Sequence, residues 1–152
     1  MKLGTAIAEI MKREGIEILC GYPVNHLIEH AANANIRPIM VRQERIGLHM
    51  ADAISRVTSG RSIGAFCMQH GPGAENAMGG VAQCFGESVP VLVLPMGYAR
   101  RLANVDPNFN SSQAMKAFSK SMPVKPIAAS PHTLMQSLSG FASFAPIARP
   151  RP

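Results

Sequence analysis

Hydrophobic positions in the first hundred residues follow two different spacings. In residues 3–13 apolar side chains recur every three or four positions, which is typical of an amphipathic helix. Residues 16–20 and 89–94 are instead short runs of mostly apolar residues, typical of strands buried on both faces. The same two patterns predict further helices at residues 25–33, 43–58 and 74–85, and further strands at residues 38–41 and 62–68.

This alternation of strands and helices predicts an α/β fold. Short apolar strands joined by helices form a parallel sheet, and right-handed crossovers place helices on both of its faces, which gives a doubly wound sheet. Ligands of such folds bind outside the carboxyl ends of the strands. We therefore expect functional residues in the loops at residues 21–25, 42–44, 69–76 and 95–100.

Beyond Tyr98 the pattern is weaker. It predicts a turn at residues 106–108, a helix at 113–120, an edge strand at 124–127 and a helix at 130–138, whereas residues 141–152 fit neither helix nor clean strand. We therefore expect one domain over residues 1–140, followed by an irregular tail at 141–152.

Composition narrows the class of protein. A hydrophobic content of 47% with 16% charged residues indicates a packed core and not a disordered chain. No apolar run approaches the roughly 20 residues of a membrane span, and the first residues lack the apolar segment of a signal peptide, so we expect a cytoplasmic protein without a membrane partner. Cys20, Cys67 and Cys84 are widely spaced, which favours buried, reduced thiols.

The net charge of +6 raises the question of nucleic acid. The basic residues of the last third are scattered, and two tyrosines with no tryptophan offer little surface for base stacking. A non-specific basic surface is therefore favoured over a specific nucleic-acid site. A non-enzymatic, basic α/β binding module remains open as an alternative.

Two loops carry candidate chemistry. Glu44 starts a helix directly after a strand, where a carboxylate is stabilised by the helix dipole and faces the ligand-binding edge. His70 precedes a turn in which Gly71 and Gly73 let the backbone approach a ligand closely. Each feature is common by itself. No set of metal-ligand residues is predicted, because the helical pair His26 and His30 has no evident third ligand.

The order of these features is more specific than any one of them. The sequence resembles the pyrimidine-binding (N-terminal) domain of thiamine-diphosphate enzymes of the acetolactate synthase-like family, over residues 3–127. The resemblance is carried by Gly21-Tyr22-Pro23, Arg42-x-Glu44, Met50-Ala51-Asp52-Ala53, Arg56, Gly71-Pro72-Gly73-Ala74-x-Asn76, Glu87-Ser88-Val89-Pro90-Val91 and Gly97.

The resemblance implies roles for the site residues. Glu44 would hydrogen-bond N1′ of the cofactor's aminopyrimidine ring and favour its 4′-imino tautomer. His70 departs from the small hydroxyl residue of many synthases, so we expect it to be a substrate-side acid or base. The residues expected to contact the cofactor are Tyr22, Pro23, Glu44, Gly71, Pro72, Gly73 and Asn76.

The resemblance also implies partners. The cofactor would be thiamine diphosphate, of which this chain would bind the pyrimidine half only. In the family, Mg²⁺ and the diphosphate bind a second domain marked by Gly-Asp-Gly, a motif these 152 residues do not contain. We therefore expect a diphosphate-binding domain or subunit as the partner, in a homo- or hetero-oligomer. The complete enzyme would be a decarboxylase or carboligase with a 2-oxo acid substrate, and this chain would be inactive without the diphosphate-binding partner.

Two forms of that expectation remain open. One is a truncated product, favoured by residues 148–152, which resemble a turn near the end of the family's domain. The other is the separate alpha subunit of a two-subunit sulfopyruvate or phosphonopyruvate decarboxylase.

Overall fold

The computed structural model describes residues 2–23, 25–97 and 143–144. The elements predicted between residues 106 and 138 lie outside these ranges. In chain order, the structure contains α1 (Leu3–Arg13), β1 (Ile18–Gly21), α2 (Leu27–Asn33), β2 (Arg37–Met40), α3 (Glu44–Val57), β3 (Gly64–Met68), α4 (Pro72–Gly86), β4 (Val91–Pro95) and β5 (Ser143–Phe144).

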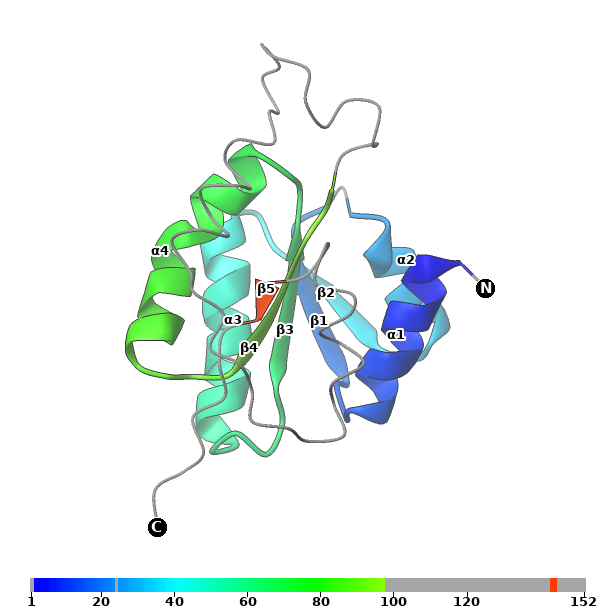
Figure 1. Cartoon of the computed structure of the whole chain (residues 1–152), viewed down its shortest axis with the longest axis horizontal. Coiled ribbons are helices and arrows are strands. Elements are labelled where there is room, and N and C mark those ends of the chain that lie inside the picture. Colours follow the sequence, from blue (N-terminus) through cyan, green and yellow to red (C-terminus); the bar gives the residue numbers. More distant parts are fainter. Residues whose placement is uncertain (1, 24, 98–142, 145–152) are drawn as a thin grey trace.

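The strands form one sheet in the order β2-β1-β3-β4-β5. The first four strands are parallel, and β5 pairs antiparallel with β4. In Figure 1, α1 and α2 cover one face of the sheet, and α3 and α4 cover the other. This arrangement confirms the predicted doubly wound α/β fold. The chain runs outward from β1 to β2 and then crosses back to β3, so the strand order reverses between β1 and β3.

The core has two halves because neighbouring residues of a strand point to opposite faces of the sheet. Leu19 and Cys67 pack among residues of α1 and α2, whereas Cys20 and Phe66 pack among residues of α3 and α4. All three cysteines are buried and free, as the sequence predicted. Burial on both faces explains why β1, β3 and β4 consist of apolar residues.

α3 is held close to the sheet. A side chain at Gly64 would place its Cβ 1.9 Å from the carbonyl oxygen of Ala51, so only glycine permits this approach. The buried hydroxyl of Ser55 donates to the carbonyl of Pro90 at 2.5 Å and accepts from the amide of Gly64 at 2.9 Å. These contacts fix α3 relative to β3, and with it the position of its first residue, Glu44.

Most predicted elements differ by one or two residues from the observed ones, and three differences have a clear local cause. α4 begins at Pro72, inside the predicted turn, because proline suits the first position of a helix. α2 begins at Leu27 and not at Asn25, whose side chain bonds to the sheet instead. β5 lies in the tail predicted as irregular, and its two residues are too few to give an alternating pattern.

Among the described helices, none combines the length and apolar character that crossing a membrane requires.

Candidate functional site

The carboxyl ends of the four parallel strands meet at one edge of the sheet. Backbone hydrogen bonds continue the pairing past the last residue of three strands, which brings together the loops that follow them. These bonds run from Tyr22 N to Cys67 O (3.1 Å), from Val41 N to Gly21 O (3.0 Å) and from Met96 N to Met68 O (2.9 Å). This is the edge at which the sequence predicted a ligand site.

Glu44 lies at this edge as the first residue of α3. Its side chain is buried, and the residue is only 7% exposed. The side-chain amide of Asn76, in the second turn of α4, donates to its Oε2 at 3.2 Å. A Cβ on Gly73 would lie 3.4 Å from its Oε1. The structure thus brings together three predicted site residues, Glu44, Gly73 and Asn76, at the neighbouring N-terminal ends of α3 and α4.

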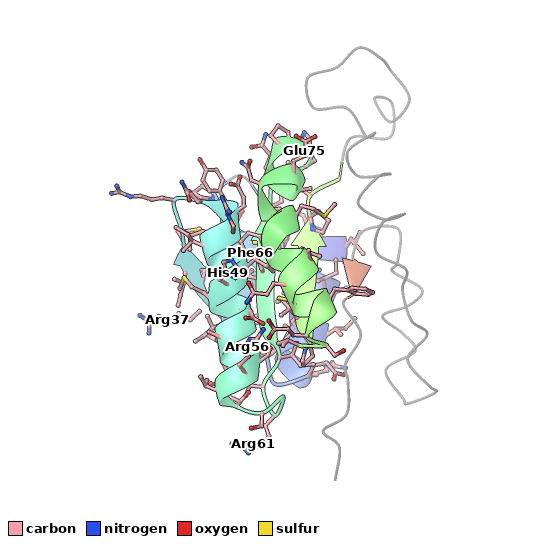
Figure 2. The ribbon with its side chains drawn as sticks, turned by 90° about the vertical axis from the view of Figure 1, so that its left-hand side faces the viewer. Arg37, His49, Arg56, Arg61, Phe66 and Glu75 are labelled. Carbon is pink, nitrogen blue, oxygen red and sulfur yellow. The ribbon has the colours of Figure 1, made fainter. Side chains whose placement is uncertain are left out.

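Figure 2 shows α3 and α4 side by side in front of the sheet, with Phe66 behind them. Glu75, in the first turn of α4, marks the end of the pair where the site lies, while Arg56 and Arg61 mark the other end.

The start of α4 has an unusual backbone. Gly71 has φ 60° and ψ −113°, a conformation that side chains of L-residues disfavour. Pro72 then takes the first helical position, and Gly73 presents bare backbone to Glu44. This sequence of glycine, proline and glycine therefore sets both the direction of α4 and the space beside the carboxylate.

The remaining predicted residues lie in the neighbouring loops. Tyr22 is half-buried and Pro23 exposed, directly after β1. His70 is half-buried between β3 and Gly71, and burial lowers the pKa of its imidazole, so the ring is neutral at neutral pH. A neutral imidazole has one donor and one acceptor nitrogen. The role of His70 as an acid or base stays a prediction.

Sequence reasoning missed Asn25. Its side-chain amide donates to the carbonyl of Met68 at 3.0 Å and to that of Leu94 at 3.1 Å, at the ends of β3 and β4. Its Oδ1 accepts from the amide of Leu27 at 2.9 Å, which starts α2. An Asn before a helix signals a cap, but nothing in the sequence signals bonds to residues 43 and 69 positions away.

A second polar cluster lies on the same helices, away from the site. The buried carboxylate of Asp52 pairs with Arg56 at 2.7 Å, and Arg56 also pairs with Glu87 at 2.5 Å. Cys84 contacts the other oxygen of Asp52 at 3.5 Å, and burial with this neighbour raises the pKa of its thiol to about 12. This cluster ties α3 to the end of α4. Within the described ranges, no three His, Cys, Asp or Glu side chains gather in a way that could hold a metal ion.

Comparison with known proteins identifies the family. The profile of the family described as "Thiamine pyrophosphate enzyme, N-terminal TPP binding domain" matches residues 1–127. The chain belongs to this family.

Its relatives include large subunits of acetolactate synthase. The chain is 31% identical over 93 residues to that of Haemophilus influenzae, covering 58% of this chain and 16% of the relative. It is 32% identical over 98 residues to the isozyme 3 large subunit of Escherichia coli, covering 61% and 17%. It is 30% identical over 97 residues to the probable large subunit of Methanocaldococcus jannaschii, covering 62% and 16%. The chain therefore matches a thiamine diphosphate-binding N-terminal domain of acetolactate synthase-like enzymes, about a sixth of their length.

Proposed function

We propose that this chain supplies the pyrimidine-binding half of the thiamine diphosphate site in a 2-oxo acid decarboxylase or carboligase. The observation that carries the proposal is the arrangement around Glu44. A buried carboxylate begins α3 at the ligand-binding edge, with one oxygen bonded to Asn76 and the other facing Gly73. Membership of the thiamine pyrophosphate family supports the choice of cofactor.

The geometry fits a flat heterocycle with a ring nitrogen. Asn76 engages Oε2 of Glu44, so Oε1 is the oxygen that would meet the nitrogen N1′. The space beside Oε1 is the space that a Cβ on Gly73 would fill. The bare backbone of Gly73 therefore leaves room for the edge of a ring next to the carboxylate.

The residues would act by placement and proton control. Glu44 would hold a proton at N1′, and its burial would strengthen that hydrogen bond by excluding water. Asn76 would fix the orientation of the carboxylate. His70, held neutral by burial, would accept or donate a proton on the substrate side. When bound, thiamine diphosphate would supply the electron sink for cleavage of the bond beside the 2-oxo group.

The diphosphate and Mg²⁺ would be held by another domain or a separate subunit. The matched relatives are about six times longer than the region they share with this chain, and the family's name assigns that region to the N-terminal part. The complete enzyme would accordingly be an oligomer in which this domain forms one wall of each cofactor site.

The test is to isolate the chain from its native cells with whatever binds it, and to assay pyruvate decarboxylation with added thiamine diphosphate and Mg²⁺. We expect activity that is lost in Glu44→Gln, and an associated or covalently continuous segment that contains Gly-Asp-Gly. Full activity in Glu44→Gln would contradict the assigned role, and so would a chain whose complexes never bind the cofactor.

A further inference from the structure

The loop that carries Tyr22 and Pro23 is anchored at both of its ends. At its start, the backbone amide of Tyr22 bonds to the carbonyl of Cys67 and extends the pairing of β1 with β3. At its end, Asn25 reaches across the sheet to the carbonyls of Met68 and Leu94. The loop therefore runs over the end of β3, at the point where the strand order reverses.

Asn25 makes more contacts than a helix start requires. Its Oδ1 and its carbonyl accept from the amides of Leu27 and Ile28, which begin α2. Those two bonds could be kept by a serine or an aspartate. Only the NH₂ group of an amide of this length donates to the two strand ends at the same time, because each carbonyl needs a donor hydrogen of its own.

The two carbonyls that Asn25 engages belong to adjacent strands. Met68 also accepts from the amide of Met96, so one carbonyl at the end of β3 joins β4 and the loop after β1. Gln69 follows Met68, and His70 and Gly71 come next in the chain. Asn25 thus links the Tyr22–Pro23 loop to the segment that leads into α4.

We propose that Asn25 is a positioning residue, whose side-chain amide fixes the loop that carries Tyr22 and Pro23 against the ends of β3 and β4. The expected effect of Asn25 on cofactor affinity rests on the proposed function. Without the amide, the loop would keep its attachment at Tyr22 and lose the one at its far end. Tyr22 would then move more freely, and the site would lose a fixed wall for the pyrimidine ring.

Tyr22 itself provides a probe. The chain has two tyrosines and no tryptophan, so in a Tyr98→Phe background the fluorescence comes from Tyr22 alone. Acrylamide quenching of that fluorescence measures the motion and access of the loop. The full chain is compared with Asn25→Ser, which keeps the start of α2, with Asn25→Ala, and with Asn33→Ala, an exposed asparagine on α2 as the control.

In both Asn25 variants we expect quenching of Tyr22 to rise by roughly twofold while unfolding stays cooperative, and Asn33→Ala to match the wild type. Thiamine diphosphate, titrated into the ¹⁵N-labelled chain and followed by NMR, should bind about tenfold more weakly to Asn25→Ser.

Unchanged quenching in Asn25→Ser would overturn the claim that Asn25 fixes the loop. Increased quenching with unchanged affinity would overturn the claim that the fixed loop supports cofactor binding. If Asn25→Ala does not fold, Asn25→Ser decides. If the wild-type chain binds no thiamine diphosphate without its partner, quenching alone decides the claim that Asn25 fixes the loop, and the proposed function is tested separately by the Glu44→Gln assay of the complex.

Discussion

Alanine substitutions at three glycines of α4 distinguish an effect on cofactor binding from an effect on stability. In Gly73→Ala, the new Cβ would lie 3.2 Å from the Cβ of Gln69 and 3.4 Å from Oε1 of Glu44. Alanine is favoured over glycine in a helix by about 1 kcal/mol, which offsets a crowding cost of similar size. We therefore expect a free energy of unfolding within about 1 kcal/mol of the wild type.

The effect of Gly73→Ala on binding should be much larger. The methyl group occupies the space beside the oxygen that would meet N1′, so the ring is displaced from the carboxylate. Loss of a hydrogen bond to a charged group costs about 1.5–3 kcal/mol, which weakens binding by about 10- to 100-fold. NMR titration of the full chain with thiamine diphosphate measures that change, and thermal unfolding measures stability.

The same helix supplies matched controls. A Cβ on exposed Gly79 meets only Arg45, at 3.8 Å, so Gly79→Ala should raise stability by about 0.5–1 kcal/mol without changing affinity. A Cβ on Gly80 lies 2.9 Å from Leu48, so Gly80→Ala should destabilise by about 1–3 kcal/mol without a specific loss of binding. Wild-type affinity in Gly73→Ala would refute the reasoning, because the space beside Glu44 would then not hold the ligand.

Further predictions concern groups outside that space. Arg56→Ala leaves the buried carboxylate of Asp52 without its ion pair and should lower the free energy of unfolding in urea by about 2 kcal/mol. This loss is smaller than the one expected on breaking a fully buried pair, because Arg56 is about one-third exposed. Glu87→Ala, at an exposed position, should cost less than about 1 kcal/mol, and equal costs would contradict this ranking. The three buried cysteines should react with a thiol reagent only when the protein unfolds, whereas rapid labelling of the native chain would be inconsistent with their burial. Burial lowers the pKa of His70 in the folded protein, so the unfolded chain binds more protons. The contribution of His70 to stability is therefore full above the ordinary histidine pKa of 6.5 and is lost as pH falls through the lower folded value. Urea unfolding between about pH 8 and pH 5 should therefore show a shallower acid loss in His70→Gln than in the exposed control His26→Gln, and parallel curves would argue against the shift.

The fold was largely predictable because its central strands are buried on both faces. Continuous apolar runs alternating with helical spacing give the class of the sheet directly, as β3 and β4 illustrate. Strand order was not predictable from spacing, since the same alternation suits several doubly wound sheets. The start of α4 was also missed, because a Gly-Pro-Gly sequence indicates a turn as readily as a first helical turn.

The site was predictable only in part. Glu44 follows a strand, and that local pattern places it at the ligand-binding edge. Its hydrogen bond with Asn76, 32 positions later, depends on how two helices pack; the family resemblance predicted both residues at the cofactor but no bond between them. The bonds of Asn25 depend on the reversal of strand order between β1 and β3, and that reversal is a property of the folded sheet.

The central claim is that Glu44 recognises N1′ of the cofactor's pyrimidine ring. The most direct measurement compares binding of thiamine diphosphate with binding of its analogue in which N1′ is replaced by CH, to the wild type and to Glu44→Ala, which has no side-chain hydrogen-bonding group. We predict that the wild type prefers thiamine diphosphate by about tenfold or more, and that Glu44→Ala removes most of that preference. Equal affinities of the wild type for the two ligands, or a preference that survives in Glu44→Ala, would contradict the account.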